Sequence, residues 1–163
     1  MPWVSIFDPA VTDTATRGYY VVYLFHSSEP LVHLSLNQGT TRTREEFGAQ
    51  ARQVLADRAA LMRRRLLDFA DVLSVRTIDL GSPKRLPADY VAGHALGRTY
   101  KLDALPAEAE LRADLDIAIR AYRALTFPRR PMNASVADGS ANKRTPLDRE
   151  TSGVRYRASS GRM

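Results

Sequence analysis

Aromatic side chains are concentrated at the start of the chain, where they could hold a planar ligand. Six of the thirteen aromatic residues fall within the first 25 positions, and they are Trp3, Phe7, Tyr19, Tyr20, Tyr23 and Phe25. Aromatic rings can stack on a base that has left a nucleic-acid helix. The same residue types also pack the core of a sheet. Two interpretations therefore stay open, a base-binding cage and an ordinary core.

Amide side chains follow shortly afterwards. Asn37 and Gln38 could supply hydrogen bonds to a base edge. The sequence Asn-Gln-Gly is also a good turn when it is taken alone. A turn is therefore the alternative to base reading at these two positions.

Basic residues are gathered in two places. Seven arginines between positions 42 and 65 stand against three acidic residues, which suits a phosphate-contacting face about as well as a solvated helix face. Residues 128–163 hold eight basic and three acidic groups, so most of the net charge of +6 belongs to this tail. The remaining body is nearly neutral, and a basic patch on it must be argued locally.

The sequence offers little for catalysis. It has no cysteine and only three histidines, which disfavours thiolate chemistry, disulfides and a metal cage. It has neither a phosphate-binding loop nor a nucleophile elbow, and Asp79 with Lys84 makes only a weak nuclease pair. We therefore expect no catalytic residues, no metal and no cofactor. Since there is no long apolar run and no signal-peptide pattern, we also expect a cytoplasmic protein without membrane contact.

The apolar pattern predicts the elements that would position these residues. Strands are expected at residues 3–7, 18–26 and 31–38. Residues 71–80 are expected to form a strand or two half-strands, and residues 97–102 an extended stretch. Helices are expected from about residue 44 to 69 and from 106 to 127. This order favours an α+β domain over residues 2–127, in which a small mixed or antiparallel sheet packs against two amphipathic helices. Residues 128–163 have few large apolar side chains, and we expect them to form a disordered basic tail.

The two strongest strands differ in their faces. Residues 18–26 are apolar on both faces, which predicts a central strand. Residues 31–38 alternate, with one apolar face and one that carries His33, Ser35 and Asn37. We expect a hairpin of the two strands, with this polar face either wet or in contact with a ligand.

Three segments carry a resemblance to a known family. They are residues 2–9 (PWVSIFDP), 17–25 (RGYYVVYLF) and 34–39 (LSLNQG). Together with the later IDLG sequence, residues 90–106 and the closing amphipathic helix, they resemble the MrcB-like N-terminal domain. That domain is the recognition module of methyl-directed restriction systems of the McrBC type. The resemblance covers residues 2 to about 127.

The resemblance implies binding of double-stranded DNA and recognition of a modified base, typically 5-methylcytosine, by base flipping. Carried over by position, Trp3 and Tyr20 would line the base pocket, and Leu24 would contact the flipped base or fill its place. We expect Ser35, Asn37 and Gln38 near the base, and Arg17, Arg42 and Arg44 on phosphates. Any GTPase or nuclease activity would reside in an effector partner or in a fused domain, as part of bacterial phage defence.

Members of this family usually carry a leading segment with a Gly-rich aromatic loop before the Pro-Trp motif. The resemblance here begins at Pro2, so we expect a domain that lacks that segment. The alternative to a DNA reader is therefore a truncated scaffold or interaction remnant that has lost its ligand. A nuclease subunit is the third hypothesis.

Overall fold

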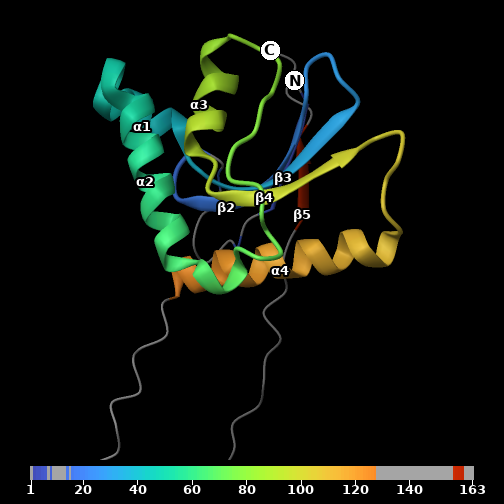
Figure 1. The fold of residues 1–163 in the computed structure, drawn as a ribbon. Helices are drawn as coiled ribbons and strands as arrows, with labels where there is room; N and C mark the ends of the chain where they lie inside the picture. The colour runs from blue at the N-terminus through green and yellow to red at the C-terminus, as the bar shows by residue number, and fades with distance from the viewer. Residues whose placement is uncertain (1, 7, 9–13, 15, 128–155, 160–163) are drawn as a thin grey trace, which may run out of the picture.

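A five-stranded antiparallel sheet forms the centre of the protein (Figure 1). The computed structural model describes residues 2–6, 8, 14, 16–127 and 156–159. The strands are β1 (Trp3–Ile6), β2 (Tyr19–Phe25), β3 (Leu31–Gln38), β4 (Leu96–Lys101) and β5 (Tyr156–Ser159). Their order across the sheet is β4-β3-β2-β1-β5. The predicted α+β fold is confirmed.

Helices cover both faces of this sheet. The α-helices are α1 (Thr40–Phe47), α2 (Ala51–Arg65), α3 (Arg85–Gly93) and α4 (Glu108–Thr126), with short 3-10 turns η1 (Gly48–Gln50) and η2 (Leu67–Phe69). Helix α4 lies across one face, α3 lies over the other, and α1 and α2 run along one side (Figure 1). None of the described helices is long and apolar enough to cross a membrane.

The central position predicted for β2 is confirmed, because its two faces belong to two separate apolar clusters. Val21 packs with the apolar face of β3 and with residues of α2 and α4. Tyr20, Val22 and Leu24 point to the opposite face and form a second cluster with residues of the 71–81 segment and α3. Burial on both faces explains why every residue of this strand is apolar.

Three expectations about local structure were wrong. The helix expected up to residue 69 is divided into α1 and α2 at Gly48, whose positive φ of 52° turns the chain. The expected loop at 81–87 contains the start of α3, and Pro87 fits there because the first helical turn has no partner for its N–H groups. The 71–80 segment is not a strand of the sheet; only Ser74 and Val75 bridge to Gly97.

The tail also differs from the expectation at one place. Residues 156–159 form β5, which pairs with β1 although this segment was expected to be disordered. An edge strand such as β1 presents unpaired backbone groups that an extended segment can satisfy whatever its side chains are. Residues 128–155 and 160–163 lie outside the described part of the chain.

Candidate nucleic-acid interface

The structure brings together the three residues expected to form the base pocket. Trp3 in β1 is the direct partner of Leu24 in β2, and Tyr20 lies four residues earlier on the same face of β2. All three belong to the second apolar cluster, with Trp3 half-buried at its margin. Tyr20 and Leu24 are each 0% exposed. Two neighbouring strands therefore place one aromatic–aliphatic group on a single face of the sheet.

Residues of the 74–80 segment and of α3 pack over these three side chains and shield them from solvent; we call them the cover. Ile78 and Leu80 contribute to the cluster from the segment that crosses the sheet, and Tyr90 contributes from α3. The Tyr20 hydroxyl donates a hydrogen bond to the Gln38 carbonyl at 3.1 Å. Burial raises the pKa of Tyr20 well above its usual value, so the hydroxyl stays protonated and can keep donating. A base can reach Tyr20 only after part of this cover has moved.

Residues 74–80, which we call the strap, are held to the sheet by two buried histidines. His33 Nε2 lies 2.8 Å from the Asp79 carbonyl oxygen, and His94 Nε2 lies 3.0 Å from the Val75 carbonyl oxygen. A carbonyl can only accept, so both Nε2 atoms carry the proton. Val75 also exchanges backbone hydrogen bonds with Gly97 at 3.0 and 2.9 Å. The strap is therefore held by the side chain of His33 in β3, by the side chain of His94 at the C-terminal end of α3, and by the backbone of β4.

Burial favours the neutral form of both histidines. Burial lowers the pKa of His94 to about 4, and the nearby His33 and Arg63 act in the same direction. Burial also lowers the pKa of His33. The Nδ1 atom of His94 accepts from the Ser35 hydroxyl at 2.7 Å. The polar contacts of the His94 ring therefore suit the uncharged form.

The expected base-edge residues lie inside the protein. Ser35, Asn37 and Gln38 are at most 3% exposed. Ser35 and Asn37 lie on the polar face of β3 with His33, which is 4% exposed, so this face is covered and is not wet. Asn37 Nδ2 donates to the Tyr90 carbonyl at 3.0 Å, and Gln38 Nε2 donates to the Leu55 carbonyl at 2.9 Å. Their amides hold α3 and α2 against the sheet, so reading a base would require them to exchange these partners.

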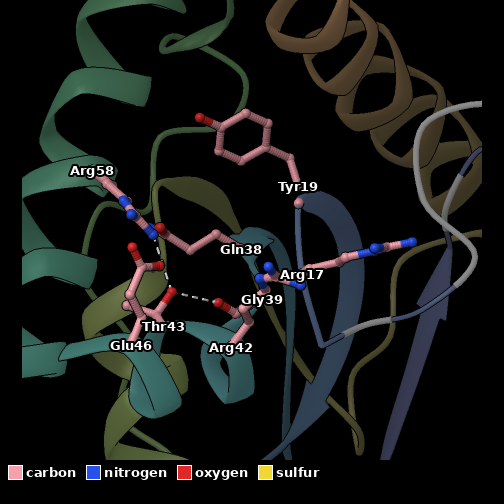
Figure 2. A pocket seen from close by; sticks show the side chains of 9 residues that line it. Arg17, Tyr19, Gln38, Gly39, Arg42, Thr43, Glu46 and Arg58 are labelled. Atoms are coloured by element: carbon pink, nitrogen blue, oxygen red, sulfur yellow. Dashed lines mark hydrogen bonds between the residues drawn. The ribbon is translucent and has the colours of Figure 1, made fainter. Parts of the chain in front are cut away.

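An open pocket of about 280 Å³ lies on the opposite side of β2 (Figure 2). It is formed by the start of β2, the junction of β3 with α1, and one residue of α2. The lining residues are Arg17, Gly18, Tyr19, Gln38, Gly39, Arg42, Thr43, Glu46 and Arg58. Gln38, Gly39 and Thr43 are buried, whereas Arg17, Arg42 and Glu46 are exposed. The pocket thus has a buried floor and a charged rim.

A close backbone approach places two of the predicted phosphate contacts at this rim. A Cβ atom on Gly39 would lie 2.2 Å from the Cα of Arg17, so only glycine fits there. The Gly39 N–H donates to the Gly18 carbonyl at 2.8 Å, and the Arg42 N–H donates to the Thr16 carbonyl at 3.2 Å. Arg17 and Arg42 also line a neighbouring hollow of about 320 Å³. The glycine of the LSLNQG segment thus allows Arg17 and Arg42 to lie together.

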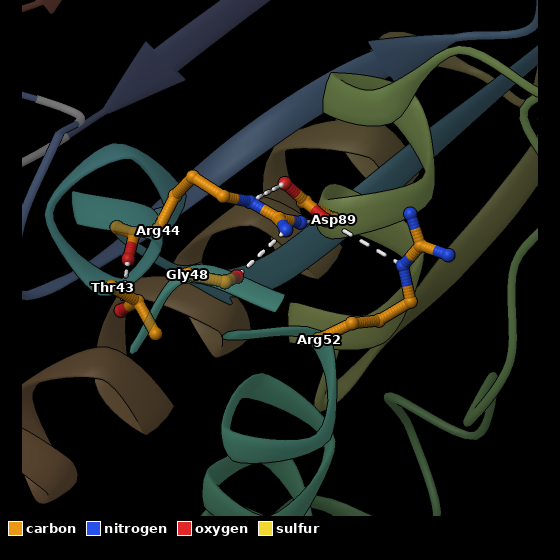
Figure 3. A network of polar contacts seen from close by, with 6 residues as sticks. Thr43, Arg44, Gly48, Arg52 and Asp89 are labelled. Carbon is orange, nitrogen blue, oxygen red and sulfur yellow. Dashed lines mark hydrogen bonds and ion pairs between the residues drawn. The ribbon is translucent and has the colours of Figure 1, made fainter. Parts of the chain in front are cut away.

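The third predicted phosphate contact has a different environment. Arg44 forms a two-pronged ion pair with Asp89 of α3, with Nε 3.1 Å from Oδ2, and it also donates to the Gly48 carbonyl at 3.0 Å (Figure 3). The Asp89 side chain is buried, and Arg52 Nε lies 3.6 Å from it. Arg44 therefore connects α1 to α3 and does not line the pocket.

Three charged or aromatic residues that line the pocket were not among the predicted site residues. Tyr19 forms one wall, and Glu46 stands at the rim. Arg58 is oriented by a 3.1 Å hydrogen bond from Nη1 to the Thr43 hydroxyl, and its guanidinium carbon lies 5.4 Å from the centre of the Phe47 ring. The aromatic crowding was the available signal for Tyr19. Neither Arg58 nor Glu46 stood out among the other charges of the helices.

Comparison with known proteins identifies the family. Residues 1–127 match the family described as MrcB-like, N-terminal domain. No curated protein and no solved structure matches the chain. The family match spans well over half of the sequence, including every strand of the sheet except β5. The chain therefore belongs to the MrcB-like N-terminal domain family.

Proposed function

We propose that this domain is a DNA-recognition module of a bacterial restriction system and binds a modified base in the cytoplasm. The observation that carries the proposal is the convergence of Trp3, Tyr20 and Leu24 on one face of the sheet. An aromatic–aliphatic group of this kind can stack on an extruded base. Stacking on an aromatic side chain is worth about 1–3 kcal/mol per base, and extrusion costs a few kcal/mol.

A base can enter this group only when the cover moves. Trp3 is half-buried and stands at the margin of the cluster, so its ring is the first surface that a base would meet. Displacing the strap would then expose Tyr20 and Leu24 behind it. The methyl group of 5-methylcytosine adds apolar surface, and burying that surface against these apolar side chains lowers the free energy of the complex. This gives a physical reason for preferring the modified base.

Binding to the DNA backbone would come from Arg17 and Arg42 and from the basic tail. These contacts are independent of sequence and weaken as salt is added. The domain itself is proposed to have no catalytic role. Cleavage of DNA or hydrolysis of GTP would belong to an effector partner.

The test is fluorescence anisotropy with three matched duplexes that carry cytosine, 5-methylcytosine or N6-methyladenine, each at two salt concentrations. We expect tighter binding of one modified duplex, with a preference that persists at high salt. Trp3→Ala should reduce that preference at least tenfold, and Tyr20→Phe should keep it because the ring remains. Phe127→Ala is the control, since Phe127 is 55% exposed and is not part of this cluster. An unchanged preference in Trp3→Ala, with the fold intact by circular dichroism, would refute the base site.

A scaffold that has kept the fold without the ligand is the second candidate. It is favoured by the closed cover and by the amides of Asn37 and Gln38, whose hydrogen bonds are already made inside the protein. The same titration separates the candidates. Equal and steeply salt-dependent binding of all three duplexes would favour the scaffold.

A further inference from the structure

The pocket in Figure 2 is separate from the closed base cluster, and its residues point to a ligand of their own. Adjacent residues of a strand face opposite sides of the sheet, so the ring of Tyr19 lies on the other side of β2 from Tyr20. Tyr19 is half-buried and packs beside the main core cluster. One aromatic wall is therefore present beside an open hollow without any change in the strap.

Arg58 provides an ordered positive charge on the α2 side of the same pocket. It is half-buried, donates to the Thr43 hydroxyl at 3.1 Å, and stacks over Phe47. Thr43 in turn donates to the Gly39 carbonyl at 3.0 Å, so the contact is tied to the buried floor. A guanidinium held in this way loses little rotamer freedom when a ligand binds.

The charges around the pocket do not suit a bare anion. Arg17, Arg42 and Arg58 make the pocket positive, but the carboxylate of Glu46 stands among them. A carboxylate repels a phosphate and accepts a hydrogen bond from an amino group, such as the exocyclic amine of cytosine. The ligand that satisfies both has an anionic part and a planar part that carries an amine.

We propose that this pocket binds one nucleotide of a DNA strand. The base stacks on Tyr19 with its amino group toward Glu46, and the phosphate lies at Arg42 and Arg17. The volume of about 280 Å³ lies just below the roughly 300–1,000 Å³ typical of small-ligand pockets, so an open pocket of this size holds no more than a single nucleotide. The neighbouring hollow shares Arg17 and Arg42, so the strand can continue across them. The identity of the ligand as DNA rests on the proposed function, whereas the nucleotide chemistry rests on the pocket.

The test is a titration of the ¹⁵N-labelled full chain with deoxycytidine monophosphate, thymidine monophosphate, deoxycytidine and inorganic phosphate. We expect deoxycytidine monophosphate to bind most tightly and to shift the backbone amides of Gly18, Gly39 and Thr43. Thymidine monophosphate lacks the exocyclic amine and should bind several-fold more weakly. If inorganic phosphate alone produces the same shifts with the same affinity, the pocket is only an anion site and the proposal is wrong.

Variants separate the parts of the site. Tyr19→Leu should weaken binding of deoxycytidine monophosphate about tenfold, while Tyr19→Phe keeps the ring and should restore it. Glu46→Ala should abolish the preference for cytosine over thymine. Arg123→Gln lies in a different hollow, beside η2 and α4, and should have no effect. Wild-type affinity in Tyr19→Leu, with an unchanged spectrum elsewhere, would overturn the proposal.

The titration with nucleotides and the titration with duplexes can fail independently, so the pocket proposal and the proposed function are tested separately. Nucleotide binding that depends on Tyr19, without any preference among the three duplexes, would support the pocket and refute modified-base recognition. A preference among the duplexes that survives Tyr19→Leu, without nucleotide binding, would do the reverse.

Discussion

Acidification is expected to destabilise the protein through His94. The ring is neutral in the folded protein, where its pKa is about 4, whereas the ordinary value is 6.5. Between these values the unfolded chain binds a proton that the folded chain does not, so the free energy of unfolding falls as the pH falls from 6.5 toward 4. At 1.36 kcal/mol per pKa unit, the loss through this one group between pH 7 and pH 5 is about 2 kcal/mol.

The assay is urea unfolding at pH 7, 6 and 5, followed by far-UV circular dichroism, on the wild type and on His94→Gln. Glutamine does not titrate, and its amide can still donate to the Val75 carbonyl. The variant should be less stable at pH 7 but should lose about 2 kcal/mol less between pH 7 and pH 5. Carboxylates that titrate in both proteins cancel in this difference. The protection of the Val75 and Gly97 amides, measured as exchange relative to the intrinsic rate at each pH, should also fall on acidification in the wild type. Equal pH dependence in the two proteins would refute the reasoning.

Three further predictions concern other parts of the structure. Gly39→Ala places a Cβ atom 2.2 Å from the Cα of Arg17, a backbone atom that cannot rotate away. In urea unfolding, this variant should lower the free energy of unfolding by about 2 kcal/mol or more. Unchanged stability would show that residues 17 and 39 lie further apart than the structure has them. Asp89→Ala removes a buried carboxylate and leaves Arg44 without its ion-pair partner, so in urea unfolding it should lower the free energy of unfolding by about 3 kcal/mol. Glu108→Ala is the control, because it removes an exposed partner of Arg112 and should lower the free energy of unfolding by less than about 0.5 kcal/mol. Replacing Arg129, Arg130, Lys143 and Arg144 by glutamine should weaken binding of modified and plain DNA equally in anisotropy. The slope of log K against log salt concentration should become shallower by up to about 0.9 for each phosphate that is no longer neutralised. A changed ratio of the two affinities would show that the tail takes part in recognising the modified base.

The patterns of the sequence predicted those parts of the fold that depend on local periodicity. Both faces of β2 are apolar, and the strand is central. The helix expected from residue 106 to 127 is α4, which covers one face of the sheet. The pairing of Trp3 with Leu24 places Trp3 on the Tyr20 face, as the assignment of these three residues to one pocket requires. Periodicity reports which face is apolar, and it succeeded wherever an apolar face meets the core.

The failures have a different cause. His33, Ser35 and Asn37 are polar, so alternation predicted an accessible face, but the strap and α3 cover it through hydrogen bonds. The alternation within one strand does not show which distant segment of the chain packs on its polar face and pairs with its side chains. The partnership of Arg44 with Asp89 has the same character, since the two are 45 positions apart and nothing near either one indicates the other.

The fastening of the strap has a kinetic consequence for the proposed base site. Within the described part of the chain, five hydrogen bonds hold it: two from the histidines, two between Val75 and Gly97, and one from the Ser27 N–H to the Leu80 carbonyl. At about 0.5–1.5 kcal/mol each, they make the open form a minor species, about one molecule in seventy at the lower value and about one in several thousand at 1 kcal/mol each. The measured affinity for an extruded base would then be the intrinsic affinity reduced by that fraction. Association would saturate at the opening rate when DNA is in excess, and a variant with a looser strap would bind modified DNA more tightly than the wild type.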